Sequence, residues 1–546
     1  MCLIFFSLFN RRFRFRHKRS LDVQRQVVSF GRFQDPRVVD LRITMTQTSG
    51  SIGTKTKKVP KPTDGGWSWL VVLGSFLVHV FTDGIVYSFG VLVGTLKKEY
   101  KGQDAAASAI VSVLVGLTLS LGPFASIVTE KFGCRLTAIA GSLIATVGCV
   151  ASYYAHSIGL LIFTMGCIMG VGFSLLYCPA IVIVSQHFEK RRGLATGIAV
   201  CGASVGTLIF PPIINFFVDS EGRGVDFWKY VYVFDTIVVF ACAFCGLLFY
   251  PPDFVEVRED GSSSKSKKTE EADDVEAQND QNPEGRKTVL SQVKNGCGWM
   301  MKMTKEAIDF TLFCHPVFMV YAVSNFVTCL GFNAPAIFIT DHGKLHGVDR
   351  STVGWLLSIF GGFNGLGRVV FGFIGDRPLC CPIWKNTARN RYSLYIICMV
   401  ICGVATITCA WCISFVALAV YAAIFGAALG GVVCLTSCVL VDFIGINKFT
   451  SAFGLLLLFQ GIGTFVGPPI AGALADITKE NADDEFAGHY TWAFLFSGAT
   501  LLISGPMLFV IPCLPNPKIT EVQSKKQSRS STNTQTERSE GVSNSI

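Results

Sequence analysis

The amino-acid sequence predicts an all-α membrane protein whose chain crosses the bilayer twelve times. Half of its 546 residues are hydrophobic and only 16% are charged, whereas a soluble domain carries about 25% charged residues. The apolar residues also gather in runs long enough to span the hydrocarbon of a bilayer as helices. These runs are 68–95, 107–128, 136–155, 158–184, 193–218, 228–250, 312–339, 352–375, 391–413, 415–441, 450–475 and 490–513.

One long polar segment, between the sixth and seventh runs, divides the twelve runs into two groups of six. The stretch between the groups is rich in Glu, Asp, Lys and Ser, so we predict a disordered cytoplasmic linker there. The expected organisation is an N-terminal tail at 1–63, a six-helix half at 64–250, the linker at 251–310, a second half at 311–513 and a C-terminal tail at 514–546. Near the N-terminus a basic stretch follows an apolar one, the reverse of the order in a signal peptide. Met45 begins a more ordinary cytoplasmic tail, so we interpret residues 1–44 as a candidate upstream extension.

Lysine positions predict that both tails are cytoplasmic. The short loops carry nearly balanced numbers of Lys and Arg on the two sides, so the tails decide the orientation by the positive-inside rule. The deciding residues are Lys55, Lys57, Lys58, Lys61, Lys518, Lys525 and Lys526. The net charge of +9 is therefore a topology signal, and we expect no nucleic-acid partner.

Several function classes find no support in the sequence. Most of the 20 cysteines lie inside apolar runs, where they behave as small hydrophobic residues, and none has zinc-site spacing. We recognise no nucleotide loop, nucleophile constellation or repeated ion filter. The sequence thus favours a protein that is neither an enzyme nor a channel and that needs no metal or cofactor.

Arg368 is the most informative residue. It is the only charge in the 23-residue run Thr352–Ile374, and a charge at such depth is costly and usually faces a partner, a cavity or a transport path. Its planar guanidinium matches a carboxylate. Gly365, Gly367 and Gly372 favour a packed or cavity-facing position, although a snorkelling arginine is the alternative. The run therefore predicts a protein that handles small organic anions.

Three polar residues share one face of the first predicted helix. His79, Asp83 and Tyr87 are spaced at i, i+4 and i+8. Asp83 could pair with Arg368 in the empty protein, or receive the cationic group of a zwitterion whose carboxylate binds Arg368. Both Asp83 and His79 are candidates for proton or pH dependence. The alternative is a helix–helix hydrogen bond with no substrate role.

The two halves carry matching loops at the cytoplasmic ends of their second helices. Both loops place an acidic and a basic residue together, and the second resembles the GxxxDR loop motif of major facilitators. We interpret the loops as a conformational latch between the half-repeats. Its candidate residues are Glu130, Lys131, Arg135, Asp376 and Arg377.

Two further strings resemble the signatures of the monocarboxylate transporter family of solute carriers. The first precedes the first helix, and the second opens the fifth helix with His187 where Tyr or Phe is usual. The resemblance covers about residues 64–513 and implies the major facilitator fold, in which two six-helix halves surround a midplane site. The signature residues are Asp64, Gly65, Gly66, Trp67, Trp69, Lys190, Arg191, Arg192, Gly197 and Gly202.

The resemblance also suggests what is transported. In the proton-coupled lactate carriers of this family, an eighth-span arginine binds the carboxylate, assisted by an aspartate one turn earlier and a first-span lysine. Arg368 matches the arginine, but Asn364 and Tyr87 occupy the other two positions. Because an asparagine takes up no proton near neutral pH, the resemblance implies a secondary transporter for a small carboxylate-bearing solute, distinct from the standard proton–lactate symporters. Proton-coupled lactate, pyruvate or ketone-body symport and substrate sensing without transport are the alternatives.

Two residues complete the expected site, and the family suggests the partners. Asn333 lies next to the helix-breaking Pro335, and Ser437 lies in the tenth predicted helix, where both could line a cavity. We expect a carboxylate or zwitterion as substrate and the plasma-membrane bilayer as surroundings. For some relatives a single-span glycoprotein chaperone is needed for surface delivery, so such a partner is a further option.

Overall fold

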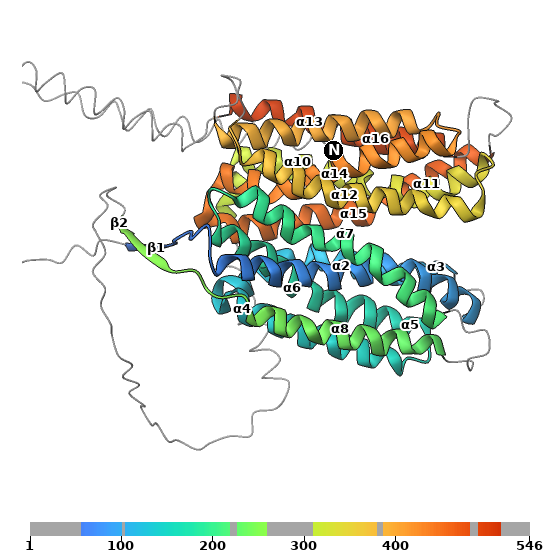
Figure 1. Ribbon diagram of the computed structural model, residues 1–546, viewed down its shortest axis with the longest axis horizontal. Helices are drawn as coiled ribbons and strands as arrows, with labels where there is room; N and C mark the ends of the chain where they lie inside the picture. The colour runs from blue at the N-terminus through green and yellow to red at the C-terminus, as the bar shows by residue number, and fades with distance from the viewer. Residues whose placement is uncertain are drawn as a thin grey trace, which may run out of the picture. The chain divides into compact units, whose positions relative to one another are not determined.

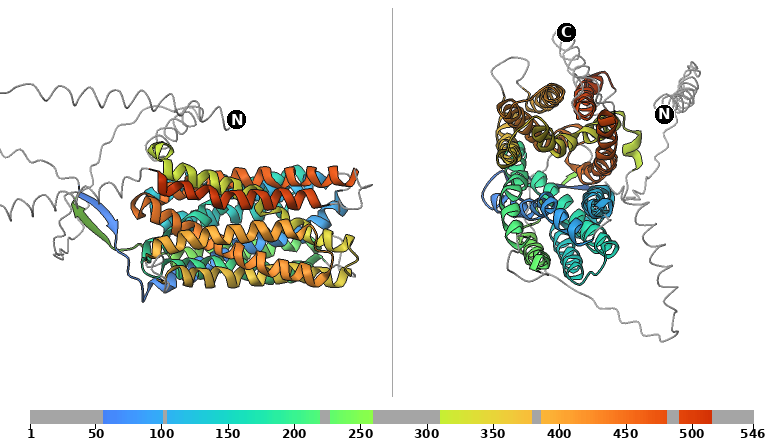
Figure 2. Two further views of the ribbon diagram at one scale, coloured as in Figure 1. Left: turned by 90° about the horizontal axis from the view of Figure 1, so that it is seen from above. Right: turned by 90° about the vertical axis from the view of Figure 1, so that its right-hand side faces the viewer.

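The computed structural model describes residues 56–100, 104–218, 227–258, 310–378, 386–480 and 490–514. Helices dominate this part of the chain, and Figure 1 shows them running side by side. Figure 2, at right, looks along the helices and shows the blue-to-green first half grouped beside the yellow-to-red second half. Most of the two predicted tails and most of the predicted linker lie outside the described residues.

The first half consists mainly of long helices. Its elements are α2 (Ser68–Glu99), α3 (Asp104–Ser120), α4 (Gly122–Tyr153), α5 (Ile158–Leu161), the π-helical η1 (Ile162–Ile168), α6 (Met169–His187), α7 (Arg192–Val218), the 3-10 helix η2 (Phe227–Lys229) and α8 (Tyr230–Leu247).

The second half repeats this pattern. Its elements are η3 (Phe310–Cys314), α10 (Pro316–Phe332), α11 (Ala334–Leu345), α12 (Arg350–Gly375), α13 (Thr387–Cys409), α14 (Phe415–Ile444), η5 (Ile446–Lys448), α15 (Phe449–Glu480), α16 (Thr491–Met507) and η6 (Leu508–Cys513).

The number of membrane passes depends on a break inside α4. Eleven described helical segments are long and apolar enough to cross a membrane, and Ala109–Ser120 is a shorter apolar helix. Gly133 has a φ of 79°, which interrupts α4 between its two helical parts and is a conformation that glycine adopts without a steric penalty. Dividing α4 there turns the eleven segments into twelve passes, with Ala109–Ser120 opening the second. The predicted all-α membrane fold is confirmed.

The two halves meet mainly where α7 packs against α12 and where α3 and α4 pack against α15. Small residues allow these close approaches: a Cβ atom added to Gly197 of α7 would collide with the backbone oxygen of Arg368, and one added to Gly122 would lie 2.6 Å from the backbone oxygen of Gly454. Glycines of this kind let membrane helices pack backbone against backbone. The α7–α12 contact therefore sets the position of Arg368.

A pair of strands, absent from the predictions, joins the N-terminal tail to the start of the linker. Strand β1 (Thr56–Pro60) pairs antiparallel with β2 (Phe254–Arg258), with Thr56 opposite Arg258. Figure 1 shows the two strands beyond the helices, at the end where α2 begins. We call this the tail end, where α2, α7, α10, α13 and α15 begin, and the opposite end the far end.

Candidate substrate site and latch

Arg368 is buried between the two halves, with 7% of its surface exposed. Its Nε donates to Asn364 Oδ1 at 3.0 Å, and its Nη1 donates to the carbonyl of Val200 on α7. Asn364 is itself held, since its amide donates to the Gly426 carbonyl at 3.2 Å and its Oδ1 accepts from Ser204 Oγ at 3.2 Å. The guanidinium plane is thus fixed by residues of α7, α12 and α14.

All of these partners of Arg368 are neutral. Within the described residues no acidic side chain forms an ion pair with it, and its Nη2 has no hydrogen-bond partner. An unneutralised charge at membrane depth costs several kcal/mol unless something pairs with it. The arrangement therefore leaves the Nη2 edge of the guanidinium available for an anion.

The polar face of α2 lies toward this charge. Gly202 and Gly206 of α7 lie against Val80 and Gly84 of α2, so α2 carries His79, Asp83 and Tyr87 at the level of Ser204, which contacts Asn364. Tyr87 is 51% exposed, so the part of this face nearest the far end is open. The ion pair between Asp83 and Arg368 that the sequence allowed is absent from this structure, which leaves the Asp83 carboxylate available to another group.

His79 is held in one orientation on the same face. Its Nδ1 lies 2.7 Å from the carbonyl of Ser75, so this nitrogen is the donor. Its Nε2 is buried without a hydrogen-bond partner among the described residues, and its ring packs edge-on against Tyr177 at 5.4 Å. His79 therefore presents an unpaired nitrogen beside the Arg368 region.

Asn333 and Ser437 occupy different surroundings. Asn333 lies at the break between α10 and α11, and Pro335 is the second residue of α11. Ser437 is buried with its hydroxyl unpartnered in the described part of the chain, so it borders no open space in this conformation. Neither role is decided by these positions. Sequence reasoning missed Ser204, although it lies two residues after the signature glycine Gly202.

The C-terminal latch loop caps a helix of the opposite half. The Asp376 carboxylate accepts from the backbone N–H groups of Gly193 and Leu194 at 2.9 and 2.8 Å, at the first turn of α7. Carboxylates are favoured at this position because helix N-termini present unpaired donors and a positive dipole. Arg391 bridges Asp376 at 2.6 Å and Asp442 at 3.2 Å, which holds the cap in place.

The N-terminal loop makes the corresponding contact in the other direction. Glu130 accepts from Ser451 Oγ at 2.6 Å, in the first turn of α15. Each half therefore contacts the start of a helix in the other half. Arg377 lies over the Phe373 ring at 4.2 Å, whereas Lys131 and Arg135 are exposed.

The two signature strings form one structural unit. Asp64 Oδ1 accepts from the backbone N–H groups of Glu189, Lys190 and Arg191 at 2.9, 2.9 and 3.3 Å. The first signature thus caps the turn of the second, immediately before α7. Trp69 packs edge-on against Phe188 at 5.1 Å, and Trp67 is exposed.

His187, the departure from the usual signature, joins three elements at the tail end. Its Nε2 donates to the carbonyl of Tyr250 at 2.8 Å, and its Nδ1 lies 3.3 Å from Ser68 Oγ. A phenylalanine could form neither bond. The histidine therefore connects the ends of α6 and α8 to the start of α2.

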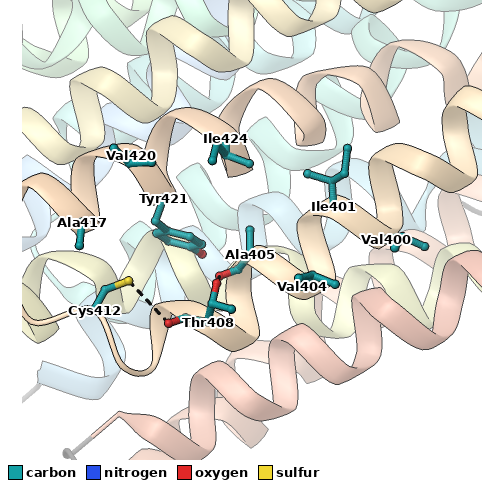
Figure 3. A pocket seen from close by; sticks show the side chains of 10 residues that line it. All are labelled: Val400, Ile401, Val404, Ala405, Thr408, Cys412, Ala417, Val420, Tyr421 and Ile424. Atoms are coloured by element: carbon teal, nitrogen blue, oxygen red, sulfur yellow. Dashed lines mark hydrogen bonds between the residues drawn. The ribbon is translucent and has the colours of Figure 1, made fainter.

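A separate groove of about 610 Å³ lies along α13 and α14, as Figure 3 shows. Its lining contains none of the predicted site residues and is mostly apolar. Within it, Cys412 Sγ donates a hydrogen bond to the Thr408 carbonyl at 3.6 Å. Several lining side chains are exposed, as expected of a surface in contact with hydrocarbon. The lining residues are Val400, Ile401, Val404, Ala405, Thr408, Cys412, Ala417, Val420, Tyr421 and Ile424.

Comparison with known proteins agrees with this architecture. The family model of the Major Facilitator Superfamily matches residues 75–301 and 321–540. Monocarboxylate transporter 12 of Xenopus laevis is 28% identical over 469 residues, covering 85% of this chain and 93% of that protein. Monocarboxylate transporter 2 of Rattus norvegicus is 29% identical, covering 86% and 87%, and monocarboxylate transporter 14 of Homo sapiens is 27% identical, covering 85% and 94%.

Solved structures with the same arrangement are much more distant in sequence. The proton:xylose symporter XylE matches with a TM-score of 0.56 at 14% identity, covering 82% of this chain and 96% of that one. The fucose:proton symporter FucP of E. coli matches with a TM-score of 0.54 at 12% identity, covering 81% and 99%. Such similarity shows a common fold, and the predicted fold class is confirmed.

Proposed function

This chain belongs to the major facilitator superfamily, with monocarboxylate transporters among its relatives, and we propose that it moves a small carboxylate-bearing organic solute across the plasma membrane. The observation that carries the proposal is the buried Arg368 guanidinium, which has neutral partners and an unpartnered Nη2 among the described residues. A solute carboxylate would accept from Nη2 and neutralise the charge. Asn364 positions the guanidinium by accepting from Nε.

The transport cycle follows from the two-half architecture. In alternating access the halves rock around a fixed midplane site. The hydrogen bonds between halves described above run from the tail end to the level of Arg368, where Ser204 contacts Asn364. This arrangement fits a carrier closed at its tail end. We place the tail end in the cytoplasm, so that the closed face is the cytoplasmic one.

The surroundings of Arg368 favour a substrate with a second polar group. Asp83 lies one helical turn after His79 on α2 and forms no ion pair with Arg368 among the described residues. A cationic group next to the substrate carboxylate would find its counter-charge there, as in a zwitterion. The same carboxylate also supports the alternative of proton-coupled symport, in which Asp83 would take the proton that Asn364 cannot.

The first test is uptake by cells that express this chain, with surface protein quantified. The panel contains lactate, pyruvate, β-hydroxybutyrate, aromatic amino acids, creatine and carnitine, at mildly acidic and at neutral pH. Replacing Arg368 by Ala should reduce uptake of the transported carboxylate to background, while Arg389→Ala, an exposed arginine of α13, should leave it unchanged. Undiminished uptake by a well-expressed Arg368→Ala variant would remove the proposed role of Arg368.

Acid-stimulated uptake of lactate or pyruvate would favour proton symport, whereas uptake of a zwitterion with little pH dependence would favour the pairing with Asp83. Saturable binding of a panel compound without its uptake would instead indicate a sensor. If the wild-type chain neither transports nor binds any panel compound, the proposed substrate class is wrong.

A further inference from the structure

Two histidines lie one turn apart where α11 ends, at the far end of the second half. His342 and His346 are spaced at i and i+4, so their side chains share one helix face. Their ring centroids are 4.4 Å apart, with 52° between the ring planes. His342 is fully buried, whereas His346 is half-buried and is followed by the exposed Gly347. Solvent therefore reaches His346 but not His342.

Hydrogen bonds to two carbonyl groups decide which nitrogen of each ring is protonated. His342 Nε2 lies 3.1 Å from the carbonyl of Cys412, and His346 Nδ1 lies 2.9 Å from the carbonyl of His342. A carbonyl only accepts, so both of these nitrogens are donors. In the neutral rings the other nitrogens, His342 Nδ1 and His346 Nε2, then carry free lone pairs.

Neither lone pair is used elsewhere in the described part of the chain. His342 Nδ1 is buried without a hydrogen-bond partner, and no bond is made by His346 Nε2. A buried acceptor without a donor is costly and needs an explanation. Phe494, with its ring centroid 5.2 Å from that of His342, and Tyr490 at 6.5 Å enclose the site without supplying a donor to Nδ1.

We propose that His342 and His346 bind a divalent transition-metal ion of the zinc type, through His342 Nδ1 and His346 Nε2, with water completing the coordination. Imidazole is a preferred ligand of Zn²⁺, Cu²⁺ and Ni²⁺. Metal-bound histidines characteristically donate their second N–H to a carbonyl, which both rings do here. With zinc–nitrogen bonds of about 2.0–2.1 Å at a tetrahedral angle, the two ring centroids would lie about 5 Å apart, so the rings, 4.4 Å apart here, would separate slightly on binding.

A residue-resolved test uses the purified full-length wild-type chain and Zn²⁺ alone. Diethyl pyrocarbonate modifies unprotonated imidazole nitrogens, and mass spectrometry locates each adduct. At a free Zn²⁺ concentration tenfold above the dissociation constant, modification of His346 should fall about tenfold. Exposed His156, in the first half, serves as the internal control and should react unchanged. Unaltered His346 reactivity, or an equal loss at His156, would overturn the proposal.

Substitutions provide a second, independent measurement. Zn²⁺ binding is titrated in competition with a chromophoric indicator. The component due to this site is the difference between the wild-type and variant titrations, in which binding by other cysteines and histidines cancels. His346→Ala should weaken this component at least about tenfold, and the exposed neighbour Lys344→Ala should not change it. Identical zinc titrations for wild type and a folded His346→Ala variant would contradict the assignment. Because neither readout involves uptake, the result is independent of the proposed transport function.

Discussion

Arg368 and Asn364 form the smallest unit that explains the proposed selectivity. The asparagine both accepts from Arg368 Nε and donates to the Gly426 carbonyl, so it is a neutral positioning residue at the place where the lactate carriers have an acid. An acid there would neutralise the guanidinium from within the protein. The amide leaves that role to the substrate, which is why a single change at 364 should alter the dependence of uptake on pH.

We predict that Asn364→Asp makes uptake acid-stimulated. An ionised carboxylate at 364 would pair with Arg368 and compete with the carboxylate of the substrate, whereas the protonated acid would not. Uptake by this variant should therefore be lower at neutral pH than at mildly acidic pH. Asn364→Ala has no titratable group and should lower uptake equally at both values. An Asn364→Asp profile parallel to that of the wild type would show that position 364 does not govern coupling.

At the scale of single elements, α7 is the helix that organises the site. Its first turn is capped by Asp376 from the other half, and the turn before it is capped by Asp64 from its own half. Further along, Gly197, Val200 and Ser204 contact α12 around Arg368. Displacement of α7 would therefore disturb both the predicted latch and the proposed substrate site.

The cap provided by Asp64 should be replaceable by asparagine but not by alanine. Asp64 has a φ of 50°, a region in which Asn and Asp are enriched, and both side chains offer an acceptor oxygen. Asp64→Ala should destabilise the folded protein by about 0.5–2 kcal/mol, seen as a lower melting temperature of the purified chain. Asp64→Asn should melt close to the wild type. Equal melting temperatures for all three proteins would show that this cap contributes little.

Helix separation at α7–α12 gives a second prediction at this scale. A Cβ at Gly197 would collide with the Arg368 carbonyl, so Gly197→Ala should cost about 1–3 kcal/mol through overpacking and lower uptake by displacing Arg368. Gly362→Ala is the matched control, because a Cβ at Gly362 of α12 meets nothing within 4 Å. Uptake and melting temperature should change only in the first variant. Similar behaviour of the two variants would mean that the close approach is not required.

At the scale of the whole molecule, the predicted latch residues contact the opposite halves through side chains and backbone amides at the tail end. Arg391, Asp376 and Asp442 form a buried ionic cluster beside α7. Two cysteines of α14 report on this contact, because Cys434 Sγ lies 3.4 Å from the Gly193 carbonyl and Cys438 Sγ lies 4.0 Å from Thr196 Oγ1. Both thiols are buried as long as the halves are closed here.

We predict that Asp376→Ala opens the tail end and exposes these thiols. Losing the cap leaves two amides of α7 without their acceptor and removes one of the two carboxylates that pair with Arg391, which favours separation of the halves. Alkylation of Cys434 and Cys438 by a membrane-permeant maleimide, measured by mass spectrometry, should become severalfold faster. Buried Cys402, which contacts the Phe425 carbonyl within the second half, should react as slowly as before. Unchanged rates at Cys434 would argue against a latch at Asp376.

The sequence by itself determined the membrane fold. A segment that crosses a bilayer must hydrogen-bond its own backbone polar groups, as a helix does, and it needs an apolar run as long as the hydrocarbon is thick. The sequence also identified Arg368, since a lone charge within such a run is conspicuous without any structure. The signature strings indicated the family, and the pairing of an acid with a base in two loops indicated a latch. Each of these conclusions depends on residues that are close together in the sequence.

Only the tertiary structure decided which residues meet across the chain. Ser204 and Val200 reach the Arg368 site because glycines bring α7 against α12, and Asp64 caps the second signature from more than a hundred residues away. The tautomers of His342 and His346 also depend on carbonyl groups that the fold supplies. Such contacts are set by helix packing and hydrogen-bond direction, which a single sequence does not encode in any local pattern.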